Sequence, residues 1–247
     1  MYKNKLLNAH IKSESAARLQ KQLLAYHDFR YVFAQSPLSE ELDKLASWQT
    51  HRLRKTHEDI YHDPRYRAGL EFLFQDLYQP KRFYQRDNEI DRIFPTMLKI
   101  LPEPLLDTIA SLIELNHLTQ ELDLNLADTL FNQFRVNEIN EQNYIQAYPI
   151  SSDKQKRLHQ IQLIANIGDD LEQYTKSRFL LFSLKVTRKP AEIAGLASLH
   201  QFLSRGFATF NAMPDVPQLL ATIISRETQL LNHIYDRQLD AFSLRSA

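Results

Sequence analysis

The sequence predicts an all-α protein, built as a single bundle of about eight to ten helices. Its 247 residues include only 4 glycines, and its prolines lie mainly between periodic apolar segments. This pattern suits long helices better than hairpins, which need glycine turns. The composition, 43% hydrophobic and 24% charged, is that of a globular chain able to bury a sizeable core. Because neither a low-complexity linker nor a solenoid repeat is visible, we expect one domain over residues 1–247, with a subdivision near 149–152 as the alternative.

The first two helices are predicted over about 13–34 and 40–62. In the first helix, apolar residues recur at helical spacing, which predicts one buried stripe; they are Ala16, Leu19, Leu23 and Tyr26. Ser36 and Pro37 interrupt the helical pattern between these two helices. Glu40 and Glu41 then place negative charge in the first turn of the second helix, where it favours the helix dipole.

A third helix is predicted to begin at Asp63-Pro64. The Asp63 side chain can cap the helix, and the fixed φ angle of Pro64 suits the first helical position. Over residues 65–78 the apolar residues Tyr66, Leu70, Leu73 and Leu77 recur at helical spacing. The alternation of a half-buried strand fails at Leu73-Phe74, and Phe72 falls on another face. We therefore expect a helix that packs on two sides.

Later helices are expected at 87–94, 95–101, 104–134, 139–148, 152–187, 190–212 and 215–242. Pro190 and Asp215 mark two of the starts. We expect the 104–134 helix to bend near Asp123, where polar residues interrupt its pattern. We also expect Gly168 to bend or divide its helix, because glycine costs about 1 kcal/mol relative to alanine there.

Composition excludes several classes of function. The 30 basic and 30 acidic residues cancel, so no overall field attracts nucleic acid, and general nucleic-acid binding is not expected. The absence of cysteine excludes disulfides, thiolate catalysis and cysteine-ligated metals. Walker, dinucleotide-binding and nucleophile-elbow motifs are also absent. The N-terminal segment does not fit a signal peptide, and no apolar run approaches the roughly 20 residues of a membrane span. We expect a cytoplasmic protein that is not transmembrane.

The charge is unevenly distributed, because residues 101–150 contain 8 acidic residues and 1 basic residue. This pattern describes either a solvated helical face or a docking surface. Our leading hypothesis is a non-enzymatic protein that acts through an unidentified protein partner, which binds the acidic 103–141 region at Glu114, Glu121 and Asp128.

The alternative is a bundle that binds an apolar or lipid-like ligand and has an envelope-related role. The 14 Phe and 11 Tyr residues could surround such a ligand, although ordinary packing explains the same composition.

A second alternative is a metal-dependent oxidase or oxygenase. Glu114 and His117 have the spacing that puts a carboxylate and an imidazole on one helical face, as in di-iron bundles. One such pair does not form a site, so we predict no cofactor.

A further segment, His57 to His62, does not have the zinc-protease spacing, since its histidines lie five residues apart. With Arg52, Arg54 and Lys55 it forms either a charged helix surface or a phosphate-binding cluster.

The window Phe72 to Tyr78, sequence FLFQDLY, resembles the motif of the FFLEELY-motif family of uncharacterised bacterial proteins. Phe72, Leu77 and Tyr78 match the motif, and Asp76 occupies one acidic position. The resemblance extends over much of residues 48–227, in blocks that include Trp48-Gln49, Arg52-Leu53, Pro64-Arg65-Tyr66, Arg86-Asp87, Arg157, Gln160-Ile161, Gly168 and Arg226-Glu227. It implies a bacterial origin and a shared helical fold. It implies no catalytic residues.

Five charged residues beside apolar segments are the candidate binding residues: Arg65, Arg86, Asp87, Arg226 and Glu227. Such residues either line a cleft or become buried charge pairs that tie helices together.

Overall fold

The computed structural model describes residues 2–33, 35–73, 93–98, 101–175, 185–186, 188–193, 197–238 and 241–242. The all-α prediction is confirmed, because these residues form helices and connecting turns, with no strand in the described ranges. The helices are α1 (Tyr2–Leu7), α2 (Glu14–Phe33), α3 (Ser39–Thr56), α4 (Glu58–His62), α5 (Arg67–Phe72), α7 (Glu103–Ala127), the π-helix η2 (Asp128–Gln133), α8 (Glu141–Ser151), α9 (Lys154–Thr175), α11 (Arg188–Ile193), α12 (Ala197–Ala212) and α13 (Val216–Tyr235). Residues 93–98 form a further short helix.

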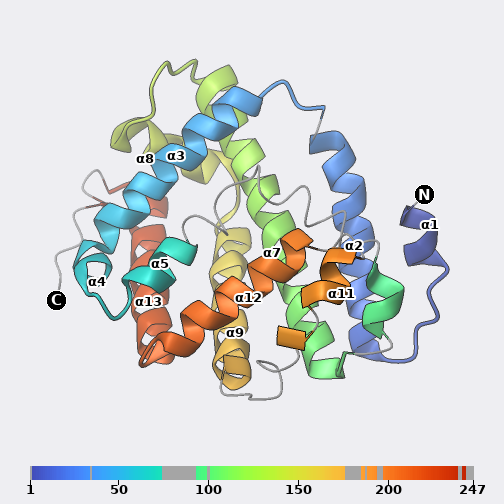
Figure 1. The fold of residues 1–247 in the computed structure, drawn as a ribbon. Coiled ribbons are helices and arrows are strands. Elements are labelled where there is room, and N and C mark those ends of the chain that lie inside the picture. Colours follow the sequence, from blue (N-terminus) through green and yellow to red (C-terminus); the bar gives the residue numbers. More distant parts are fainter. Residues whose placement is uncertain are drawn as a thin grey trace.

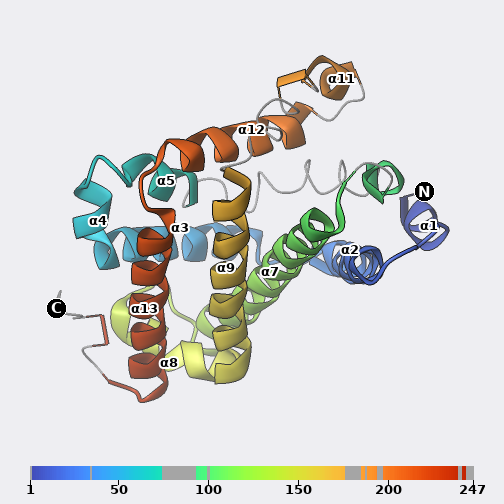
Figure 2. The same ribbon diagram turned by 90° about the horizontal axis from the view of Figure 1, so that it is seen from below.

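Helix α7 lies at the centre of the arrangement, between α2 on one side and α9 on the other (Figure 1). Helices α9 and α13 pack side by side and run in opposite directions, and α12 crosses one end of the pair (Figure 2). Helix α3 and helix α8 complete the group around the other half of α7. This arrangement brings five helices, α3, α7, α8, α9 and α13, to one region.

The buried apolar side chains form three clusters. One joins α1, α2, residues 93–98 and the first half of α7. A second joins α3, the end of α7, η2, α8 and α13. The third joins α5, α12, the end of α3 and the start of α13. The stripe predicted for α2 lies in the first cluster, because Ala16, Leu19, Leu23 and Tyr26 are each at most 4% exposed.

The helix predicted to run to His62 is divided at His57, where α3 ends and α4 begins. The sequence prediction was wrong here because the break depends on a distant contact. The His57 side chain is fully buried, and its Nε2 lies 3.0 Å from an oxygen of Glu227, 170 positions along the chain.

The third helix begins at Arg67, a few residues after the predicted start at Asp63-Pro64. Asp63 still accepts a hydrogen bond from a free amide, that of Arg65, at 2.9 Å. Leu70 and Phe72 are both buried, as expected for a helix that packs on two sides. The remainder of the predicted stripe, residues 74–78, lies outside the described residues.

Helix α7 continues through Asp123, and the hydrogen-bond pattern changes to that of a π-helix at Asp128. Helix α9 likewise continues through Gly168, so the predicted division is wrong. A Cβ atom at Gly168 would lie 2.3 Å from Cδ1 of Leu220. This glycine therefore allows close approach of α13.

The two predicted helix starts have different outcomes. Asp215 caps α13, because its side chain accepts a hydrogen bond from the Gln218 amide. Pro190 lies inside α11, which begins two residues earlier at Arg188. Among the described helices, none combines the length and the hydropathy needed to cross a membrane.

Candidate functional site

A cavity of about 60 Å³ lies where the five helices meet. Its walls combine charged, amide, hydroxyl and aliphatic side chains. The polar residues are Gln49 and Arg52 of α3, Thr119 and Asp123 of α7, Tyr144 and Tyr148 of α8, Arg157 and Gln160 of α9, and Glu227 of α13. Aliphatic side chains of α9 and α13 form the rest of the wall, so the cavity has both polar and apolar lining.

Arg157 is the most unusual of these residues, since it is only 2% exposed and forms no ion pair with any carboxylate of the described residues. Its guanidinium donates to the Ser152 hydroxyl at 3.1 Å, to Gln160 Oε1 at 3.5 Å and to the Leu122 carbonyl at 3.4 Å. It also lies over the Tyr148 ring at 4.2 Å. These hydrogen bonds are longer than the roughly 2.7–2.9 Å of a charge-assisted bond. Each guanidinium nitrogen thus has a hydrogen-bond partner, but the charge has no carboxylate at ion-pair distance among the described residues, although a buried charge is normally paired.

Asp123 faces the same cavity from α7. It accepts one hydrogen bond, from Gln49 Nε2 at 3.1 Å. Burial raises the pKa of Asp123, and the positive charge of Arg157 and the hydrogen bond from Gln49 oppose that rise only in part. Gln49 is 5% exposed, and its Oε1 has no hydrogen-bond partner within the described part of the chain. The cavity therefore contains an acceptor that lacks a donor.

The charge of Glu227 is compensated within the protein. Arg52 Nη1 donates to Glu227 Oε1 at 2.6 Å, and His57 Nε2 lies 3.0 Å from the same oxygen. Burial raises the pKa of Glu227, but the charges and hydrogen bonds of Arg52 and His57 outweigh that effect and lower it to about 2. Glu227 therefore stays ionised at neutral pH, whereas Asp123 is the cavity carboxyl that protonates more readily.

Two tyrosines supply hydroxyl groups to the cavity. Burial raises the pKa of both Tyr144 and Tyr148, so both phenols stay protonated and can donate. The Tyr144 hydroxyl lies 3.5 Å from Gln49 Nε2, and its ring stacks on Trp48 with the centroids 4.2 Å apart. Trp48 is the single tryptophan of the chain, so its fluorescence reports on this wall of the cavity.

The candidate binding residues predicted from sequence are distributed over the molecule. Glu227 lies in the cavity wall, whereas its neighbour Arg226 points to α4 and binds Asp59 through two hydrogen bonds of 2.6 and 2.7 Å. Arg65 is exposed and pairs locally with Asp63. Arg86 and Asp87 lie outside the described residues.

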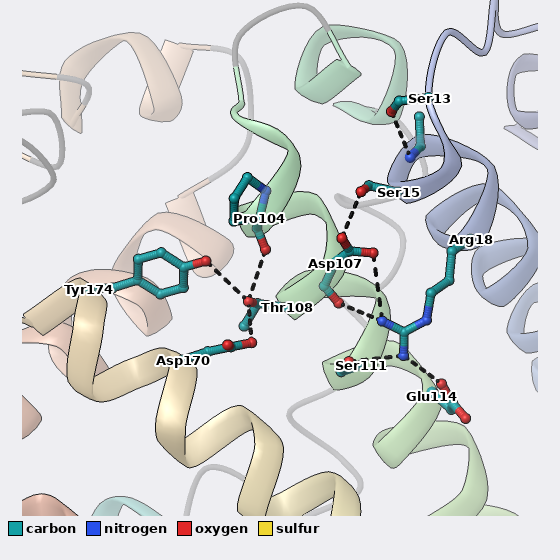
Figure 3. Close-up of polar contacts among 11 residues, drawn as sticks. Ser13, Ser15, Arg18, Pro104, Asp107, Thr108, Ser111, Glu114, Asp170 and Tyr174 are labelled. Atoms are coloured by element: carbon teal, nitrogen blue, oxygen red, sulfur yellow. Dashed lines mark hydrogen bonds and ion pairs between the residues drawn. The ribbon is translucent and has the colours of Figure 1, made fainter.

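The charges of the predicted acidic interaction face are already engaged within the chain. Glu114 binds Arg18 of α2 at 3.0 Å and His159 of α9 at 2.8 Å. Arg18 also donates to the Ser111 hydroxyl, so this contact ties α2 to α7 (Figure 3). Glu121 pairs with Lys156 at 2.7 Å, and Asp128 accepts hydrogen bonds from two amide side chains in its own helix.

In the weak metal-binding pair, Glu114 contacts Arg18 and His159, and His117 lies in an aromatic environment. His117 packs against the rings of Tyr26 and Phe29, and burial lowers its pKa. Within the described ranges, no group of three or more His, Asp or Glu residues is arranged to hold a metal ion.

The basic cluster of α3 does not form one phosphate site. Arg52 turns inward to Glu227, Lys55 pairs with Glu141 at 3.0 Å, and Arg54 lies 5.7 Å from the Tyr61 ring centroid.

Arg157, Asp123 and Gln49 were not identified as site residues from the sequence. A signal was present, because Arg157 shares a helical stripe with Ile161, Ile164 and Gly168, and Glu227 shares one with Ile223, Ile224 and Leu230. A charged residue at an apolar stripe position has to face the interior. Which partner it meets there depends on the packing of other helices.

The comparisons with known proteins identify a family without an assigned function. No curated protein and no solved structure is found to match the chain. The family match does not bear on the FFLEELY motif, so that resemblance stays a prediction. A family model does match residues 28–241, which is most of the chain and includes every polar residue of the cavity wall. The chain belongs to this family, described as a domain of unknown function, DUF8198.

Proposed function

We propose that this protein binds a small molecule that has a negatively charged group and a short apolar part, in the cavity between α3, α7, α8, α9 and α13. The observation that carries the proposal is the buried guanidinium of Arg157, which faces the cavity without an ion-pair partner among the described residues. Burying an unpaired charge is costly, and an anion in the cavity removes that cost.

The cavity walls support both parts of this ligand. Arg157 presents a planar set of N–H donors, and the Tyr148 hydroxyl, which has no hydrogen bond to a described residue, is a further donor. Ile161, Ile164 and Ile223 provide a surface for an apolar group. The cavity volume of about 60 Å³ limits the ligand to a small molecule.

This proposal modifies the sequence-based hypothesis of an apolar or lipid-like ligand. The aliphatic residues of the wall are compatible with that hypothesis, but the charged residues that line the same cavity favour a ligand with a polar end. The envelope-related role stays a prediction, as does action through a protein partner. For the protein partner, the intramolecular pairs of Glu114 and Glu121 leave less free charge for docking than the sequence suggested.

The test is a fluorescence titration of Trp48 in the purified full-length protein, with acetate, propionate, inorganic phosphate and chloride as probes. We expect a saturable change with a probe that enters the cavity, because Trp48 stacks on Tyr144 in its wall. Arg157→Gln should weaken binding at least about tenfold, since a tenfold change is about 1.4 kcal/mol and charged hydrogen bonds contribute about that much or more.

Lys156→Gln is the matched control. It removes the same charge one position earlier in α9, where Lys156 is exposed and pairs with Glu121. We expect the Lys156→Gln variant to bind the probes with the same affinity as the natural chain. Far-UV circular dichroism establishes that both variants are folded. Equal effects of the two substitutions, or the failure of every probe to saturate, would refute the proposed function.

A further inference from the structure

We propose that the ligand is a short monocarboxylate and that it binds together with one proton, which is held on Asp123. This inference rests on the proposed function and deepens it, because it specifies the ligand class and predicts how pH regulates binding.

The charges around the cavity require such a proton when an anion binds. Glu227 already has Arg52 and His57 as partners, which leaves Arg157 and Asp123 as the two groups that respond to a ligand. A carboxylate beside Arg157 puts a second negative charge in the small space that Asp123 faces. Two carboxylates confined in this way share a proton, because both cannot stay ionised at low cost.

Asp123 is the group that receives the proton. The charged, titratable and amide groups that line the cavity with it include Gln49 and Arg52 from α3, Tyr144 and Tyr148 from α8, Arg157 from α9 and Glu227 from α13. Glu227 does not take the proton, since Arg52 and His57 keep its pKa at about 2. The two phenols are already protonated. Burial raises the pKa of Asp123 even without a ligand, and a nearby anion raises it further.

Gln49 provides independent geometric support for a proton at this position. Its amide reaches Asp123 at 3.1 Å, yet its buried Oε1 has no donor among the residues that the structure describes. A protonated Asp123 is a donor beside that amide, and rotation of the amide by about half a turn brings the oxygen to it. The proton thus satisfies an acceptor that is otherwise left without a partner.

A monocarboxylate fits these walls better than other small anions. Its planar group matches the paired N–H donors of Arg157, which a spherical chloride does not. Its alkyl end meets the aliphatic wall at Ile161, Ile164 and Ile223. Inorganic phosphate has no apolar part, and its dianion brings two charges, which one shared proton does not offset.

The test is isothermal titration calorimetry of the full-length protein with propionate, in buffers that differ in ionisation enthalpy. At a pH above the pKa of Asp123 in the unliganded protein, where propionate is also ionised, we expect uptake of about one proton. Affinity should fall about tenfold per pH unit above the pKa of Asp123. Asp123→Asn should still bind, because an amide donates as a protonated carboxyl does, but without proton uptake and without this pH dependence.

Glu121→Gln is the control, since Glu121 lies two residues earlier in α7 and pairs with Lys156 outside the cavity. It should keep the full proton uptake. Propionate binding without proton uptake, or with the same uptake in Asp123→Asn, would overturn this inference and leave the proposed function intact. Binding of phosphate but not of propionate would overturn the ligand class. If none of the four probes binds, both proposals fail.

Discussion

Replacing Glu227 with Gln tests whether the Arg52–Glu227–His57 contact stabilises the fold. The Glu227 side chain is 17% exposed and accepts from Arg52 and lies beside His57 Nε2. Its pKa falls from 4.5 to about 2, and a shift of this size corresponds to about 3 kcal/mol of folding free energy. Removing the charge also takes away the carboxylate that Arg52, 13% exposed, binds in the natural chain. We expect Glu227→Gln to lower the free energy of unfolding by about 3–5 kcal/mol.

The same shift predicts how stability depends on pH. The folded-state pKa of Glu227 lies below its unfolded value, so the contribution is fully present above about pH 5 and is lost as pH falls towards 2. The difference in unfolding free energy between the natural chain and Glu227→Gln should therefore narrow over that interval. Urea unfolding followed by circular dichroism, at a series of pH values, measures both effects.

Asp59→Asn provides the matched control in the adjacent ion pair. The hydrogen bond from Arg226 is the main cause that lowers the pKa of Asp59, also to about 2, but the Asp59 side chain is 51% exposed. Solvent screens such a pair, so we expect a loss of less than about 1 kcal/mol. Equal losses for Asp59→Asn and Glu227→Gln would refute the argument that burial sets the strength of these contacts.

Three further predictions concern helix packing, helix capping and the contact of α2 with α7. Gly168→Ala should destabilise the protein by about 1–3 kcal/mol, because the added Cβ meets Leu220. In a double-mutant cycle measured by urea unfolding, Leu220→Ala should cost less in the Gly168→Ala variant than in the natural chain. Asp215 has a left-handed backbone with φ 51° and caps α13. Asp215→Ala should therefore lower the free energy of unfolding, measured by thermal unfolding, by about 1 kcal/mol, and Asp215→Gly by only a few tenths of a kcal/mol. Equal losses for the two variants would contradict this account of the cap. Arg18→Gln should lower the unfolding free energy by about 1–2 kcal/mol because it removes donors to Ser111 and Glu114, whereas Lys3→Gln, at the exposed pair with Asp28, should have almost no effect in the same assay.

The sequence predicted correctly those helix features that depend only on residues close together in the chain. The buried stripe of α2 needs only apolar residues at helical spacing, and the cap at Asp215 needs only a side-chain oxygen before a proline-containing first turn. By contrast, the break at His57 depends on Glu227, and the requirement for glycine at position 168 depends on Leu220. These contacts join residues far apart in the chain, so no local pattern encodes them.

The candidate site was predictable only in part for the same reason. Glu227 was identified as a charge within an apolar segment, and Arg157 and Asp123 are charges of the same kind that were not identified. Their sequence positions show that they face the interior. Only the packing of α3 against α13 shows that Glu227 pairs with Arg52, and only the packing of α9 against its neighbours shows that Arg157 forms no ion pair with a described carboxylate.

A crystal structure of the full-length protein grown with propionate tests most directly whether Arg157 holds an anion in this cavity. We expect density for a carboxylate between the Arg157 guanidinium and Asp123, with its alkyl end towards the aliphatic wall of α9 and α13. Both carboxylate oxygens should lie within hydrogen-bond distance of Arg157. A cavity that contains only ordered water bridging Arg157, Gln49 and Asp123 at saturating propionate would contradict the account and assign these residues a structural role.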